Sequence, residues 1–141
     1  MNDYVDSMCI SINLLSEYVH NKNVEAGWWT DLKTGESMLG YKDGYEPLYS
    51  NAKRDILMLL CLVHSEISEA CEGVRKNCMD DKLPHRTMLE VELADAMIRM
   101  FDIAGAHNLD LGGAIAEKLE YNSKREDHKL ESRMSAGGKK V

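Results

Sequence analysis

Four acidic residues lie where the sequence otherwise predicts apolar helix. Glu66 and Glu69 stand three positions apart in the most apolar segment of the chain, and Glu92 and Asp95 repeat that spacing further on. Residues three apart share one face of a helix, with Cβ atoms about 5–6 Å apart. Each pair therefore presents two carboxylates on one side of its helix, and the two pairs would form a single cluster if their helices face one another.

Such a cluster needs compensating positive charge. Four carboxylates roughly 4–8 Å apart repel by about 2–4 kcal/mol per pair at an effective dielectric constant of 20, and their six pairs by on the order of 10–20 kcal/mol. This repulsion exceeds the stability of a typical small domain, and Arg99 beside the second pair offers only one positive charge. The four acids offer only oxygen ligands, with no His or Cys on the same helix faces, and such ligands suit the hard cations Mg²⁺ and Mn²⁺.

A carboxylate site for Mg²⁺ indicates phosphate-ester or phosphoanhydride chemistry, because Mg²⁺ usually shares its coordination shell with substrate phosphates. The alternative interpretation is a solvated helix edge, on which the acids pair with Arg99 or with lysines one turn away. A single E-x-x-E pair would favour this alternative. Two pairs, each set in an apolar helix, favour the metal site.

A second polar group, Lys118, Asn122 and Arg125, has spacings of four and three, which places the three side chains on one helix face. Two cations and an amide suit phosphate oxygens, since Arg binds them through a planar fork and Lys through a point charge. The alternative is an ordinary set of cations that complements the dipole at a helix C-terminus.

Two adjacent aromatic residues, Trp28 and Trp29, lie in a Gly-rich segment. Nucleobases stack on such rings with a gain of roughly 1–3 kcal/mol each. The sequence therefore makes both residues candidates for binding a base. Equally, one of the two rings would serve to close the end of a helical bundle, and the sequence leaves these roles open.

Helical periodicity predicts the elements that must position these residues. Apolar residues recur every three or four positions, as in amphipathic helices, over residues 4–20, 50–76, 88–107 and 111–125. Ser50 or Asn51 is the expected N-cap of the second helix and Asp110 that of the fourth. The 20–50 segment is expected to be a binding loop or lid, because long structureless stretches are rare in small domains. Residues 126–141 are expected to form an extended polar tail.

Helices of these lengths joined by turns predict an all-α fold, a four-helix bundle in one domain over residues 1–141. The apolar faces of the second and third helices are wide for so small a bundle. We therefore expect the surplus apolar surface to be buried against a second subunit.

Composition restricts the partners. The chain has 24 acidic and 17 basic residues and a net charge of −7, which disfavours nucleic acid and anionic membranes. Its longest apolar run, residues 56–63, is far shorter than the about 20 residues that span a bilayer. The first residues show no secretory signal. The four cysteines form no C-x-x-C pair, so we expect them to be free, reduced thiols. These features predict a cytoplasmic protein.

The acidic motifs resemble those of a known family. Glu66-x-x-Glu69 followed by Glu92-x-x-Asp95 is similar to the E-x-x-E…E-x-x-D signature of the MazG-like, all-α nucleoside triphosphate pyrophosphohydrolases. The likeness to small phage and bacterial members covers most of residues 18–141, and it is carried further by residues 64–70, 91–96 and 117–122, by Gly27-Trp28-Trp29 and by the Gly-Lys-Lys ending. The 30–50 insertion and the 127–135 stretch depart from the family's pattern.

The resemblance implies a function. Members cleave the bond between the α- and β-phosphates of a nucleoside triphosphate and release a monophosphate and pyrophosphate. In this chain the four acids would hold Mg²⁺, for which Mn²⁺ substitutes, and orient the attacking water. Lys118, Asn122 and Arg125 match the family's phosphate-binding K-x-x-x-N-x-x-R stretch. Members form homodimers or homotetramers with sites near subunit interfaces, and a phage branch, active in the host cytoplasm, converts dGTP to dGMP.

Two other classes of enzyme do not fit the sequence. A di-iron carboxylate bundle needs two Glu-x-x-His motifs, and Glu17-x-x-His20 is the only one present. The His-Asp phosphohydrolases need a His-Asp dipeptide, which this sequence lacks. A non-catalytic helical partner or regulatory protein remains the alternative, and release of pyrophosphate from nucleotides distinguishes it from an enzyme.

Overall fold

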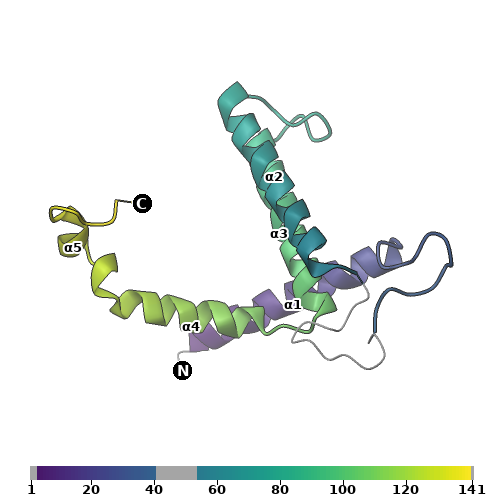
Figure 1. Cartoon of the computed structure of the whole chain (residues 1–141), viewed down its shortest axis with the longest axis horizontal. Helices are drawn as coiled ribbons and strands as arrows, with labels where there is room; N and C mark the ends of the chain where they lie inside the picture. Colours follow the sequence, from purple (N-terminus) through teal and green to yellow (C-terminus); the bar gives the residue numbers. More distant parts are fainter. Residues whose placement is uncertain (1–2, 41–53, 141) are drawn as a thin grey trace. The chain divides into compact units, whose positions relative to one another are not determined.

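The computed structural model describes residues 3–40 and 54–140 (Figure 1). Within these residues the chain is helical and has no β-strand beyond two isolated bridges, Thr30–Ser37 and Met79–Thr87. The helices are α1 (Asp3–Glu25), α2 (Ile56–Lys76), α3 (Met88–Ala106), α4 (Leu111–Lys124), the 3₁₀ helix η1 (Glu126–His128) and α5 (Leu130–Met134). The all-α prediction is therefore confirmed for this part of the chain. None of these helices is long and apolar enough to cross a membrane.

The chain divides into two compact units. Unit 1 comprises residues 1–13 and 110–141, and unit 2 comprises residues 14–109. Helix α1 contributes its first part to unit 1 and the rest to unit 2. A single domain with a four-helix arrangement stays a prediction.

Unit 2 is built around a hairpin of α2 and α3, which lie side by side in Figure 1. Asp55 caps the start of α2 by accepting the Leu57 N–H, and Thr87 with Glu90 forms a capping box at the start of α3. The turn between the helices begins at Asn77, in the left-handed conformation (φ 50°) that ends many helices. The two helices are therefore antiparallel.

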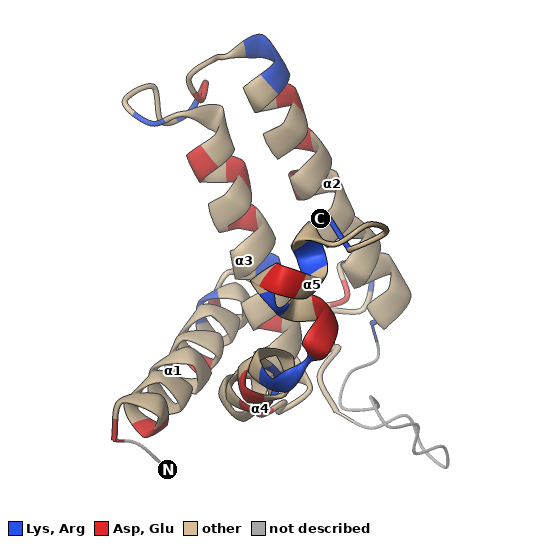
Figure 2. Ribbon diagram, turned by 90° about the vertical axis from the view of Figure 1, so that its left-hand side faces the viewer, with Lys and Arg blue, Asp and Glu red and all other residues tan. Residues whose placement is uncertain are grey.

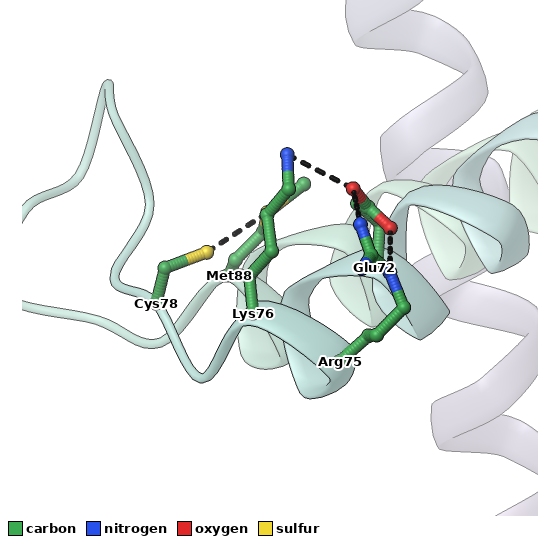
Figure 3. A network of polar contacts seen from close by, with 5 residues as sticks. All are labelled: Glu72, Arg75, Lys76, Cys78 and Met88. Atoms are coloured by element: carbon green, nitrogen blue, oxygen red, sulfur yellow. Dashed lines mark hydrogen bonds and ion pairs between the residues drawn. The ribbon is translucent and has the colours of Figure 1, made fainter.

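A close approach fixes the hairpin near its turn. A Cβ atom on Gly73 would lie 2.9 Å from Cβ of Met88, so only glycine fits there without a shift of α3. Beside it, Glu72 binds Arg75 and Lys76, and the Cys78 thiol lies 3.6 Å from the Met88 sulfur (Figure 3). The Glu72 contacts lie within α2, whereas the approach of Gly73 and the contact of Cys78 bring the end of α2 and the turn against Met88 of α3.

A small apolar core joins the rest of unit 2 to the open end of the hairpin. It contains Trp29 from the segment after α1, Leu59 of α2, and Ile103 and Ala106 of α3. Gly105 of α3 directly faces the backbone and side chain of α1 near His20. Because Gly105 has no side chain, α1 and α3 come into backbone-level contact at this point.

In unit 1, the first turn of α4 contacts the N-terminal part of α1. Asp110 caps α4 by accepting the Gly113 N–H and also accepts a hydrogen bond from the Asn13 side chain at 2.7 Å. The Asn13 carbonyl oxygen in turn accepts the Gly112 N–H at 2.8 Å. The predicted N-cap of this helix is therefore confirmed.

Several predicted boundaries were wrong. Helix α2 begins at Ile56 with Asp55 as its cap, not at Ser50 or Asn51, which lie outside the described residues. Helix α1 continues to Glu25, so the predicted 20–50 loop starts six residues later than expected. The tail over residues 126–141 is not simply extended, because it contains η1 and α5.

The described part of the loop, residues 26–40, is folded locally. Asp31 accepts the N–H groups of Lys33 and Thr34 and closes a tight turn, and Met38 donates its N–H to the Trp29 carbonyl at 2.8 Å. The segment is thus a short turn held against the core, whereas its continuation over residues 41–53 lies outside the described residues.

Candidate metal centre

Three of the four predicted carboxylates come together between α2 and α3. Glu66 and Glu69 of α2 and Glu92 of α3 each offer an oxygen atom, and these oxygens all lie within 4.8 Å of one another. Glu66 and Glu92 are buried, each with 7% exposure, and Glu69 is exposed. We call these three residues the carboxylate cluster. Figure 2 shows acidic bands on both helices of the hairpin.

Asp95 does not belong to this group of oxygens. It lies one turn after Glu92 on α3, and its charge contributes to the electrostatic environment of Glu92. It also lines a pocket next to the cluster. Asp95 is therefore a neighbour of the carboxylate cluster and a lining residue of that pocket.

Arg99 of α3 supplies a positive charge to the cluster. Its Nε and Nη2 atoms lie 2.7 and 2.6 Å from the same oxygen of Glu66, Oε1. Glu66 Oε2 takes no part in these two contacts. One guanidinium thus faces three clustered carboxylates, so the negative charge is only partly compensated by the protein.

The burial of the cluster and its uncompensated negative charge change the pKa of Glu92. Burial raises the pKa of this carboxyl group from 4.5 to about 7, with further contributions from the charge of Glu69, a hydrogen bond with Glu66, and the charges of Glu66 and Asp95. A carboxyl group placed among like charges keeps its proton well above its usual range. The cluster therefore tends to bind a positive charge, which a proton provides at neutral pH.

The donor set fits a hard divalent cation. It consists of carboxylate oxygens from two helices, without His or Cys. Two of the three carboxylates are buried. Mg²⁺ and Mn²⁺ prefer such oxygen ligands. A cation held by Glu66, Glu69 and Glu92 would take the place of the proton on Glu92.

A pocket of about 230 Å³ adjoins the cluster. Apolar residues of α2 and α3 line it together with Trp28, and its polar lining residues are Asn23, Arg54, Asp95, Arg99 and Asp102. Asp95 and Arg99 connect it to the cluster. It is therefore a space where a small molecule would have an aromatic ring, an amide, two guanidinium groups and two carboxylates within reach.

The two tryptophans have different environments. Trp29 is 1% exposed, and its Nε1–H donates a hydrogen bond to Asp102 at 2.9 Å. The prediction that Trp29 binds a base does not fit this burial, because protein atoms cover both faces of the ring; it has the packing role that the sequence left open. Trp28 is 64% exposed and lines the pocket, so it remains a candidate.

Arg54 links the tryptophans to the start of α2. Its Nη1 donates to the Trp28 carbonyl at 2.8 Å, and its guanidinium lies 5.3 Å from the centre of the Trp29 ring. The sequence reasoning did not single out Arg54. No pattern could have shown it, because the contact joins residues 26 positions apart across a loop.

The predicted phosphate-binding residues belong to unit 1. Lys118 lies over the Tyr121 ring at 4.8 Å, and Arg125 binds both oxygens of Asp127. The hydrogen bond with Asp127 raises the pKa of Arg125 above its usual value. Oδ1 of Asn122 is buried and has no hydrogen-bond partner among the described residues. Binding of phosphate by these three residues stays a prediction.

Comparison with known proteins gives no further information on the site: no protein-family model, curated protein or solved structure matches the chain.

Proposed function

We propose that this protein is a Mg²⁺-dependent nucleoside triphosphate pyrophosphohydrolase that cleaves the α–β phosphoanhydride of a (d)NTP into (d)NMP and pyrophosphate. The observation that carries the proposal is the approach of three carboxylates from two helices to within 4.8 Å, with Glu92 protonating near pH 7. The resemblance of the acidic motifs to the MazG-like enzymes belongs to the same proposal.

In this proposal Glu66, Glu69 and Glu92 hold the cation, and Asp95 is available one turn away on the pocket side. When bound, Mg²⁺ would neutralise phosphate charge and make an attacking water more acidic. Mn²⁺ would substitute, since it accepts the same oxygen ligands.

The chain's own residues would bind and orient the substrate. Arg99 lines the pocket, has a 40% exposed side chain and binds Glu66, so it would be available to the phosphates of a bound substrate. A charged donor beside the phosphates offsets the repulsion that a net charge of −7 exerts on a polyanion. Trp28 offers an exposed ring on which a base can stack.

The test is product analysis over a panel of NTPs and dNTPs, dGTP included, with Mg²⁺ or Mn²⁺. Pyrophosphate with a nucleoside monophosphate supports the proposal, whereas inorganic phosphate with a diphosphate would indicate cleavage of the β–γ bond instead. No product from any nucleotide, with metal and pH varied, would favour the non-catalytic helical partner.

A matched pair of variants makes the test specific to the cluster. Glu69→Gln removes one cluster oxygen charge and should abolish pyrophosphate release. Glu72→Gln changes a glutamate one turn further along α2 that pairs with Arg75 and Lys76 instead. It should keep the activity of the unmodified protein.

A further inference from the structure

The C-terminal segment is positively charged, in contrast to the rest of the chain. Residues 124–140 contain six lysines and arginines against three acidic residues, a net charge of +3 in a chain of net charge −7. The segment lies in unit 1 and includes η1 and α5. Because the remainder of the chain is strongly acidic, this segment is the part of the protein that favours contact with an anion.

The chain folds back on itself after α5 (Figure 1). Gly137 has a φ of 80°, in the left-handed region that favours glycine. At Gly138 the chain approaches α5 so closely that a Cβ atom would overlap the carbonyl oxygen of Ser132. The two glycines therefore allow residues 139 and 140 to lie beside α5.

Arg133 of α5 binds the end that folds back. Its Nε and Nη2 atoms donate to the carbonyl oxygens of Lys139 and Lys140 at 3.4 and 3.2 Å, and the Lys140 ammonium donates to the Arg133 carbonyl oxygen at 2.7 Å. These contacts use two of the five N–H donors of the guanidinium. The other three, and the ammonium of Lys139, take part in no hydrogen bond among the described residues.

A cavity of about 180 Å³ is lined by Asp127, His128, Arg133 and Lys139, which we call the tail cavity. The charge of Asp127, the one carboxylate in this lining, is offset by Arg125, which donates to both its oxygens at 3.0 and 2.7 Å. These hydrogen bonds hold the pKa of Asp127 below its usual value. Arg133 and Lys139 form no ion pair with a carboxylate in the described part of the chain.

The charges around the tail cavity suit an anion with two negative charges. Arg133 and Lys139 contribute two positive charges that no carboxylate offsets, and the His128 ring adds a nitrogen that can donate a hydrogen bond. Arginine binds phosphate oxygens through its planar fork, and lysine binds them as a point charge. The cavity is smaller than the roughly 300–1,000 Å³ of pockets that enclose a whole small-molecule ligand. It therefore suits a phosphate group and not an entire nucleotide.

We propose that the tail cavity binds a phosphate-type anion, either free phosphate or pyrophosphate or the phosphoryl end of a phosphate ester, through Arg133, Lys139 and His128. None of the three predicted phosphate-binding residues of unit 1 lines this cavity. Residues 127–135 depart from the pattern of the MazG-like enzymes, so the proposal does not follow from that resemblance. It requires no divalent cation, because protein side chains supply the positive charge, and it does not depend on catalysis.

The first test is calorimetric titration of the full chain with inorganic phosphate or pyrophosphate in EDTA at low ionic strength. Lys139→Gln removes one of the two charges and keeps the backbone carbonyl that Arg133 binds. It should weaken the affinity about tenfold, as for the loss of a charged hydrogen bond. Lys129→Gln is the matched control, because Lys129 pairs with Glu126 and does not line the cavity. It should change the affinity by no more than about twofold.

Three outcomes of this titration would overturn the proposal. The first is that neither anion binds to the unmodified protein. The second is an unchanged affinity in Lys139→Gln, which would place the anion elsewhere. The third is an equal loss in Lys139→Gln and Lys129→Gln, which would show that the anion responds to the net charge of the segment and not to the tail cavity.

The second test needs no variant. In ¹H–¹⁵N spectra of the full chain, inorganic phosphate should shift the amide signals of Gly137 and Gly138, which lie next to Lys139 in the chain, and leave those of Gly73 and Gly105 of unit 2 unchanged. The same titration with a nucleoside monophosphate separates the two sources of the anion. Equal shifts support the phosphoryl end of a larger molecule, and shifts with the free anion alone support phosphate or pyrophosphate. Shifts confined to other glycines would overturn the assignment.

Discussion

The indole N–H of Trp29 and the ring of His20 share one oxygen of Asp102. Oδ1 of Asp102 lies 2.9 Å from Trp29 Nε1 and 2.7 Å from His20 Nδ1, and all three side chains are mostly enclosed. The two rings meet edge to face at 5.4 Å. A single carboxylate of α3 therefore binds both α1, through His20, and the segment after α1, through Trp29. Trp28, which lines the pocket, directly precedes Trp29 in the sequence.

Asp102→Ala should destabilise the protein by about 2–4 kcal/mol, because it leaves two enclosed donors without their acceptor. The measurement is urea unfolding followed by tryptophan fluorescence. Asp81→Ala, which changes an exposed aspartate of the α2–α3 turn, should shift the free energy of unfolding by less than about 0.5 kcal/mol. Equal stabilities of the two variants would show that the Asp102 contacts contribute little.

The tryptophans provide a second prediction. Trp29→Ala should cost about 3–5 kcal/mol, as for other large buried rings, whereas Trp28→Ala should leave the unfolding free energy nearly unchanged because its ring is exposed. If the proposed hydrolase activity is present, Trp28→Ala should raise KM and reduce discrimination between bases. An unchanged substrate profile would assign Trp28 no role in base binding.

The sequence predicted the helices well where a buried face gives the apolar residues a helical repeat. The apolar stripe of α3 and its flanking polar residues located its limits to within a residue. The start of α2 was wrong because Ser50, Asn51 and Asp55 are equally good caps by residue type, and only the structure selects Asp55. The end of α1 was missed because its last turn is mostly exposed and shows no apolar repeat. Helix α5, with five residues, is too short for periodicity to detect.

The candidate site was likewise predictable only in part from the sequence. Spacing along single helices paired Glu66 with Glu69 and Glu92 with Asp95, since a period of 3.6 determines which residues share a face. Only the structure shows that Glu92 joins the first pair while Asp95 stays outside the group of oxygens. The pocket depends on contacts between distant segments, such as Trp29 with Asp102, 73 positions apart. The position of an aspartate between Phe101 and Ile103 was the available signal for that anchor, but local spacing does not indicate its partners.

The raised pKa of Glu92 predicts how stability depends on pH. The folded protein keeps a proton on Glu92 up to about pH 7, whereas the unfolded chain releases it near pH 4.5. The free energy of unfolding should therefore fall as pH rises through this window, by on the order of 1–3 kcal/mol in metal-free buffer. Glu92→Gln should flatten this part of the profile. Thermal unfolding in EDTA at intervals of pH measures the effect, and an identical slope in the variant would exclude Glu92 as its source.

Arg99 should limit the repulsion within the cluster when no cation is bound. Arg99→Met keeps the apolar stem and removes the contacts to Glu66, so the metal-free protein should lose about 1–2 kcal/mol of stability, a partly exposed pair being worth less than a buried one. The stabilisation by added Mg²⁺ should then increase. Arg86→Met breaks an exposed pair with Glu90 at 3.1 Å and should change stability by no more than about 0.5 kcal/mol.

Binding of a divalent cation to the cluster can be measured independently of activity. Mg²⁺ or Mn²⁺ at a hundredfold excess over its dissociation constant should stabilise the protein by about 2.7 kcal/mol, because only the folded chain brings the three oxygens together. Glu69→Gln should remove most of this gain, and Asp95→Asn, which changes a neighbour of the cluster, a smaller part of it. Both variants should have a metal-free stability equal to or above that of the unmodified protein because the repulsion is smaller. Glu72→Gln should keep the full gain. Equal stabilisation of all three variants by Mg²⁺ would mean that the cation binds away from the carboxylate cluster.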